Sequence, residues 1–102
     1  MQPFPEVLAG KHVHFIGAKG TGMAALAEIF AARGAMLSGS DVPDTFYTDA
    51  ILRSIHMKVN ESFEAAHLGP DIDLVIFSDA YNAGSNPEMA EAERRKLPML
   101  SF

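Results

Sequence analysis

A short glycine-rich segment near the start of the chain has the composition of an anion-binding loop. It covers residues 17–22, sequence GAKGTG, and lies between an apolar stretch and an amphipathic one. Glycine allows a tight turn and lets a phosphate approach the backbone N–H groups, and a following helix adds partial positive charge at its N-terminus. Glycine is common in tight strand-to-helix turns of every function, so the loop alone is weak evidence. Its position between a strand and a helix favours a phosphate site.

The spacing of these glycines departs from the dinucleotide-binding fingerprint. The pattern G-x-G-x-x-G would place glycine at positions 17, 19 and 22, whereas position 19 is Lys19 and the middle glycine is Gly20. We expect Gly20 and Gly22 to present N–H groups to a diphosphate, with a positive φ at one glycine of the loop. The sequence leaves two interpretations of Lys19 open: its ammonium reaches a phosphate as a point charge, or it points into water.

Two polar residues stand where the second and fourth strands should end. Asp41 follows the loop at about the 20-residue spacing at which an acidic residue accepts hydrogen bonds from ribose hydroxyls. Its alternative role is to begin the turn into Val42 and Pro43, and we favour the ligand contact. Ser78 would either donate to a phosphate or cap a turn.

No other group of residues indicates catalysis or a metal. The chain has no cysteine, which excludes disulfides, thiolate ligands and thiol nucleophiles. His12 and His14 share one face of the first strand, but no third ligand follows at metal spacing, so we interpret them as core or edge residues. His56 and His67 have the positions of helix-end residues. We therefore predict no catalytic residue and no metal site.

Composition argues against two classes of partner. The 102 residues carry a formal charge of −5, and the cationic cluster at 94–96 falls where a helix should end and complements its dipole. A nucleic-acid partner would need a basic face with aromatic residues among it, so we expect none. No apolar stretch approaches the roughly 20 residues that cross a bilayer, and residues 1–15 lack an export signal. We expect a cytoplasmic domain with no membrane partner.

The elements that position these residues follow from an alternation of short apolar runs with amphipathic stretches. Strands are expected at 12–16, 35–39, 57–59, 72–77 and 97–100. Helices are expected at 22–33, at 46–55, at 61–68 and after Asn86. Gly34 should end the first helix, and the second should bury Tyr47, Ile51, Leu52 and Ile55. In the last helix Asn86 is the N-cap, Pro87 takes the first position, and Glu88 and Glu91 lie at the positive end of the helix dipole.

This order of elements predicts an α/β fold. Right-handed crossovers from a central first strand give an open, doubly wound, parallel sheet of five strands in the order 3-2-1-4-5. The core is expected to contain Val13, Phe15, Leu26, Phe30, Leu74 and Ile76. The ends of strands one and two adjoin in this topology, which brings the glycine loop and Asp41 together.

The sequence resembles the Mur ligase family, and within it the UDP-N-acetylmuramate–L-alanine ligases of peptidoglycan synthesis. The resemblance rests on motifs in matching order along nearly the whole chain: HFIG at 14–17, GTGM at 20–23, LAE at 26–28, SGSD at 38–41, SDA at 78–80, NPE at 86–88 and LPML at 97–100. Two positions depart from the family pattern. Lys19 replaces a third glycine, and Asp79 replaces a second serine and places a negative charge near the expected phosphate site.

The resemblance implies a Rossmann-like N-terminal domain, here residues 1–102, that holds the UDP part of UDP-N-acetylmuramic acid. It implies a central domain with ATP and magnesium, absent from this fragment together with the C-terminal domain that binds the amino acid. The fragment alone is then inactive: the family joins the muramoyl carboxylate to L-alanine through an acyl phosphate. The implied UDP-sugar contacts are Gly17, Ala18, Lys19, Gly20, Thr21, Gly22, Met23, Ser40, Asp41, Ser78 and Ala80.

Three alternatives remain open. The murein-peptide ligases of cell-wall recycling have a similar first domain. A dehydrogenase domain would bind NAD through the same loop, although Lys19 argues against it. A regulatory domain that senses nucleotides would need no catalysis at all. A P-loop in sequence beyond Phe102 would favour a ligase.

Overall fold

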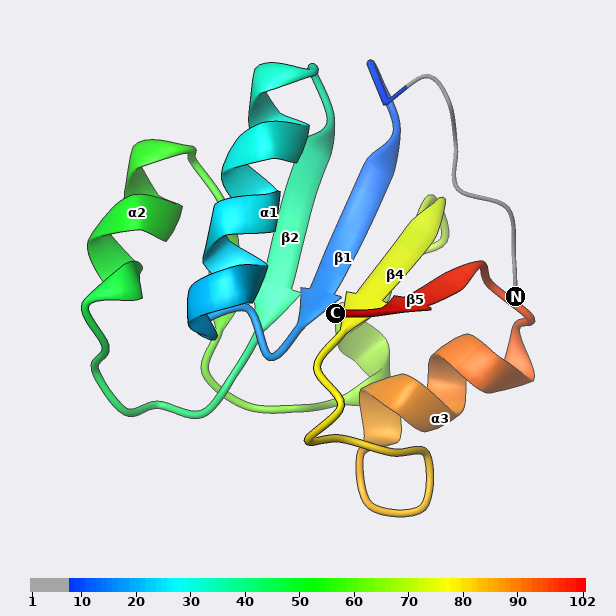
Figure 1. The fold of residues 1–102 in the computed structure, drawn as a ribbon. Coiled ribbons are helices and arrows are strands. Elements are labelled where there is room, and N and C mark those ends of the chain that lie inside the picture. The colour runs from blue at the N-terminus through cyan, green and yellow to red at the C-terminus, as the bar shows by residue number, and fades with distance from the viewer. Residues whose placement is uncertain (1–7) are drawn as a thin grey trace.

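A five-stranded parallel sheet forms the centre of the molecule, in the order β3-β2-β1-β4-β5 (Figure 1). The structure, a computed structural model, describes residues 8–102. The expectation that residues 1–15 hold no export signal therefore falls partly outside the described residues. The strands are β1 (His12–Ile16), β2 (Met36–Ser40), β3 (Lys58–Asn60), β4 (Leu74–Phe77) and β5 (Met99–Ser101). The predicted α/β class and strand order are confirmed.

Helices cover both faces of this sheet. The described residues form α1 (Thr21–Ala32), α2 (Thr48–Ser54), the 3-10 turn η1 (Ala65–His67) and α3 (Pro87–Arg94). Side chains of α1 and α2 share one core cluster with the sheet, and side chains of α3 pack into a second cluster with residues that flank η1. Because β1 alternates, Val13 and Phe15 join the first cluster and Ile16 joins the second.

Local signals explain where two of the helices end or begin. Gly34, with a φ of 86°, follows α1 in the left-handed conformation that glycine adopts without a Cβ clash. At the start of α3 the Asn86 side chain accepts hydrogen bonds from the backbone N–H groups of Glu88 and Met89, at 2.9 and 3.2 Å. Pro87 occupies the first helical position, where its missing N–H costs nothing.

The structure corrects several predicted elements. The helix expected at 61–68 is only the three-residue turn η1, and the helix expected at 46–55 is shortened to α2. Tyr47 is not buried: 69% of its surface is exposed, because it lies in the approach to α2 and donates to the Thr21 hydroxyl instead. The first strand has the predicted bounds, and each of the other four starts one or two residues later than expected, where pairing with its neighbour begins.

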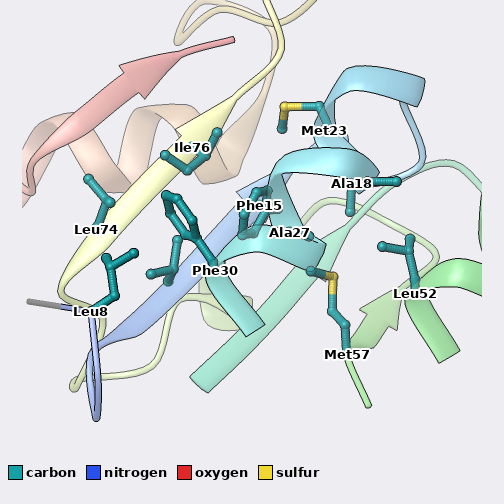
Figure 2. Close-up of a cluster of buried hydrophobic side chains, with 12 residues drawn as sticks. Leu8, Phe15, Ala18, Met23, Ala27, Phe30, Leu52, Met57, Leu74 and Ile76 are labelled. Atoms are coloured by element: carbon teal, nitrogen blue, oxygen red, sulfur yellow. The ribbon is translucent and has the colours of Figure 1, made fainter. Parts of the chain in front are cut away.

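The predicted core residues gather on the α1 side of the sheet (Figure 2). Val13, Phe15, Leu74 and Ile76 are fully buried, Phe30 is 2% exposed, and Leu26 is partly buried against them. The rings of Phe15 and Phe30 meet edge to face, with centroids 5.9 Å apart. Such pairs add packing energy beyond the area that they bury.

Phe30→Ala should lower the free energy of unfolding by about 3–5 kcal/mol, because it removes a buried ring and leaves a cavity beside Phe15. Urea unfolding followed by circular dichroism measures this change. The matched control is Ile29→Ala, one position earlier in α1, where the side chain is 51% exposed and the loss should stay below about 1 kcal/mol. Equal losses for the two variants would contradict the assigned helix face.

Candidate functional site

The glycine loop turns from β1 into α1 and is hydrogen-bonded to the end of β2. The N–H groups of Gly17 and Ala18 both donate to the Ser40 carbonyl, at 2.8 and 3.2 Å, and the Gly20 N–H closes the turn onto the Gly17 carbonyl at 3.2 Å. Gly17 has a φ of 88° and is the loop glycine with the expected positive φ. These bonds fix the path of the loop before the helix begins.

Close approach of β2 to this loop requires a second glycine. A Cβ at Gly39 would lie 2.8 Å from the Ala18 Cβ and 2.9 Å from the Met57 sulfur. Ala18 and Ser40 were both predicted to contact the ligand, and the side chains of both are buried. Their structural role is to fix the loop to the sheet.

The first turn of α1 presents three backbone N–H groups without a partner in the described part of the chain: those of Thr21, Gly22 and Met23. The preceding residue, Gly20, is the N-cap and has no side chain with which to accept from them. Unpaired N–H groups at a helix start, combined with the helix dipole, attract anions. The loop glycines therefore position α1, and the helix itself supplies the donors.

Phe102 lies beside this helix start. Its ring would be 3.0 Å from a Cβ placed on Gly22. Its N–H donates to the Phe77 carbonyl at 2.9 Å, which carries the pairing of β5 with β4 one residue further. Glycine at position 22 therefore leaves room for an aromatic ring against the helix.

Asp41 holds the loop through its carboxylate. The side chain is 6% exposed; Oδ2 accepts from the Lys19 N–H at 2.8 Å and Oδ1 accepts from the Val42 N–H at 2.7 Å. The second contact is the turn interaction that we considered as the alternative role. The ribose contact of Asp41 stays a prediction.

The Lys19 side chain does not point into water, which contradicts one of its two expected interpretations, and the phosphate contact stays a prediction. Its side chain is 3% exposed, and Nζ donates to the Asp44 carbonyl at 2.7 Å and to Glu61 at 3.0 Å, with Asp49 at 3.6 Å. Burial lowers the pKa of Lys19, but the contacts with Glu61 and Asp49 outweigh it and raise the pKa above 10.5. Lys19 therefore carries a charge that ties the loop after β2 to the residue after β3.

A cavity of about 190 Å³ opens above the loop at the carboxyl ends of β1, β2 and β4. Six predicted contacts line it, together with two aromatic residues that the sequence did not single out: Gly17, Lys19, Gly20, Asp41, Ser78, Ala80, Phe46 and Tyr81. Ser78 accepts from the Ala80 N–H at 3.2 Å, which is a turn cap. Phe46 was expected only as the first residue of a helix, and Tyr81 lies in an irregular loop, so neither was predicted to contact a ligand.

A buried polar cluster on the opposite face of the sheet was also not predicted from the sequence. Glu88 is fully buried, and its carboxylate contacts His14 Nε2 at 2.6 Å and His67 Nδ1 at 2.8 Å. His14 Nδ1 also lies 2.8 Å from the Ser38 hydroxyl. Burial raises the pKa of Glu88, but the hydrogen bonds from the two histidines outweigh it and hold the pKa below 4.5. Glu88 was expected only to complement the helix dipole.

The histidines in this cluster bind protein groups. Among residues 8–102 no group of three or more histidine or acidic side chains is arranged to hold a metal ion. No helix in the same range is long and apolar enough to cross a membrane. His56 lies just after α2 with a φ of 60°, as a helix-end residue can.

Comparison with known proteins identifies relatives for almost the whole chain. Residues 12–102 match the family described as Mur ligase family, catalytic domain. The UDP-N-acetylmuramate–L-alanine ligase of Treponema pallidum (strain Nichols) is 49% identical over 98 residues, which are 96% of this chain and 20% of that protein. The enzyme of the same name from Desulfitobacterium hafniense (strain Y51) is 44% identical, over 89% of this chain and 20% of its own length.

Two solved structures share the fold. The UDP-N-acetylmuramate–alanine ligase of Thermotoga maritima superposes with a TM-score of 0.78 at 29% identity, covering 88% of this chain and 20% of its own. The UDP-N-acetylmuramate:L-alanyl-γ-D-glutamyl-meso-diaminopimelate ligase of Neisseria meningitides gives a TM-score of 0.76 at 29% identity, covering 91% and 29%. This chain spans about a fifth of the length of the curated relatives that it matches.

Glu88→Gln should lower the free energy of unfolding at pH 7 by about 1–3 kcal/mol, because the amide cannot accept from both His14 and His67 as the carboxylate does. Urea unfolding at a series of pH values measures the effect. The folded-state pKa of Glu88 lies below its unfolded value of 4.5, so its contribution is complete above pH 4.5. The difference between wild type and variant should shrink as the pH falls below 4.5.

Glu93→Gln is the matched control, since Glu93 is an exposed residue of the same helix. It should leave the stability at pH 7 unchanged. A Glu88→Gln variant as stable as this control at pH 7 would refute the structural role of the cluster.

Proposed function

The chain belongs to the Mur ligase family, and we propose that it binds the UDP part of UDP-N-acetylmuramic acid at the start of α1. The observation that carries the proposal is the set of three N–H groups, at Thr21, Gly22 and Met23, that have no partner among residues 8–102. They point from the N-terminus of a 12-residue helix, where an anion is stabilised by both hydrogen bonds and the helix dipole. The diphosphate of the ligand is such an anion.

The other parts of the ligand would lie in the cavity beside this helix start. Its floor is glycine, at Gly17 and Gly20, which lets a ligand approach the backbone. Asp41 offers the ribose a carboxylate, as acidic residues at the end of the second strand do in related folds. Ser78 and Ala80 line the opposite side. Lys19 also lines the cavity while its ammonium is paired with Glu61, and its contact with a phosphate stays a prediction.

In the whole enzyme this chain would be the N-terminal domain of a cytoplasmic, ATP-dependent ligase of peptidoglycan synthesis. The sequence contains no G-x-x-x-x-G-K-[ST] motif, and residues 8–102 offer no metal-binding group. ATP and magnesium would therefore be held by the central domain, where the muramoyl carboxylate is activated as an acyl phosphate and attacked by L-alanine. The C-terminal domain would bind that amino acid, and this chain would contribute substrate binding alone.

A recycling ligase that attaches a peptide to the same UDP-sugar is the second candidate. It is supported by the structural likeness to the Neisseria meningitides ligase, whose name specifies a tripeptide. The 49% identity to an L-alanine ligase favours the first candidate. Both use the same nucleotide, so the proposed role of this chain is the same in either enzyme.

Isothermal titration calorimetry of the 102-residue chain with UDP and with NAD tests the proposal. We expect UDP to bind more tightly than NAD, and Gly20→Val to remove UDP binding, because a branched side chain at the N-cap crowds the three N–H groups. Gly20 has a φ of −61°, and a Cβ there would meet no atom closer than 3.4 Å. The variant should therefore fold, with a loss of about 1 kcal/mol from the poor N-cap.

The control is Gly69→Val, in the turn between η1 and β4, where a β-branched side chain stands away from the cavity lining. It should bind UDP with wild-type affinity. Tighter binding of NAD than of UDP, or normal UDP binding by a folded Gly20→Val variant, would overturn the proposed site.

A further inference from the structure

Tyr81 stands directly over the glycine turn. Its ring carbons would lie 2.8 and 3.4 Å from a Cβ on Gly17, so the edge of the ring touches that glycine. One side of the ring packs on Phe63, with centroids 4.9 Å apart and a tilt of 53°. Tyr81 thus reaches from the loop after β4 across the end of β1.

The hydroxyl of this tyrosine ends on Asp41. It donates to Asp41 Oδ1 at 3.4 Å, whereas the backbone donors Val42 and Lys19 reach the same carboxylate at 2.7 and 2.8 Å. Hydrogen bonds weaken as the donor–acceptor distance approaches 3.5 Å. Of the three donors that residues 8–102 place on this carboxylate, the tyrosine hydroxyl is therefore the weakest, and it alone belongs to a side chain.

The cavity that Tyr81 bounds is small for a nucleotide. It measures about 190 Å³, below the roughly 300–1,000 Å³ of most small-molecule sites. Tyr81 lines this cavity with its side chain. The backbone hydrogen bonds of the loop fix the positions of the other lining residues Gly17, Gly20 and Asp41. The cavity can enlarge most easily on the Tyr81 side.

We propose that Tyr81 competes with the ligand for Asp41: a ribose hydroxyl of the bound nucleotide replaces the Tyr81 hydroxyl on Asp41 Oδ1, and the tyrosine ring turns away from Gly17. The proposal rests on the proposed function, because it takes a nucleoside diphosphate as the ligand. The exchange exists only for a ligand with a hydroxyl to donate. Tyr81 thereby sets the affinity of the site, since each binding event breaks one internal hydrogen bond and forms one with the ligand.

Tyr81→Phe tests this exchange because it keeps the ring and removes the competing hydroxyl. Titration calorimetry with UDP should show roughly a two- to tenfold gain in affinity, the equivalent of one net hydrogen bond. The same variant titrated with 2′,3′-dideoxyuridine diphosphate should show no gain, because that probe has no ribose hydroxyl to place on Asp41. A gain in affinity for both probes would overturn the exchange, because the variant would then act only by enlarging the cavity.

Tyr47→Phe is the matched control: it removes the other tyrosine hydroxyl of the chain, which donates to Thr21 Oγ1 at 2.8 Å and does not contact Asp41. It should leave UDP affinity within about twofold of wild type. It also leaves Tyr81 as the single tyrosine, so its ring signals in ¹³C NMR should move when UDP is added.

The outcomes separate the inference from the proposed function. Unchanged or weaker UDP binding by Tyr81→Phe, or a stationary Tyr81 ring signal at saturating UDP, would overturn the exchange while the UDP site survives. Failure of both the wild-type chain and Tyr81→Phe to bind UDP at millimolar concentration would overturn the proposed function, and the exchange with it.

Discussion

The arrangement of the site depends on how the end of β2 captures the turn after β1. The Ser40 carbonyl accepts two loop N–H groups, and the adjacent Asp41 carboxylate accepts the next one, from Lys19. A buried N–H without a partner is costly, so these bonds fix the turn at one height above the sheet. The helix α1 begins directly after this hydrogen-bonded turn, and its first three N–H groups have no partner among residues 8–102. The proposed anion site thus consists of the N–H groups that the hydrogen bonds of the loop leave without a partner among the described residues.

The fixed turn explains why so many of the implied contact residues contribute without reaching the cavity. Ala18 and Ser40 are buried supports, and Met23 contributes a backbone N–H while its side chain lies in the core. Lys19 differs from these residues, because it lines the cavity and its ammonium also forms an ion pair across two loops. The backbone path at this position depends on the Lys19 N–H, which donates to the Asp41 carboxylate.

Much of the fold was predictable from the sequence because local and periodic signals agreed. Asn86 with Pro87 began a helix, Gly34 ended one, and the alternation in β1 separated its two faces. The residues that escaped prediction depend on contacts distant in sequence. Glu88 looked like a helix-dipole residue, yet it meets His14 from 74 positions away. Tyr81 lies in a loop without a pattern, and its place in the site becomes visible only once β2 brings Asp41 beside it.

The central claim is that the N-terminus of α1 holds a diphosphate. The most direct measurement is a ¹⁵N–¹H NMR titration of the chain with UDP, with the amide signals of Thr21, Gly22 and Met23 followed individually. The account predicts that these three amides show the largest changes and move downfield in the proton dimension, as N–H groups do when they donate to phosphate. Saturable UDP binding that leaves these three amide signals in place would contradict it.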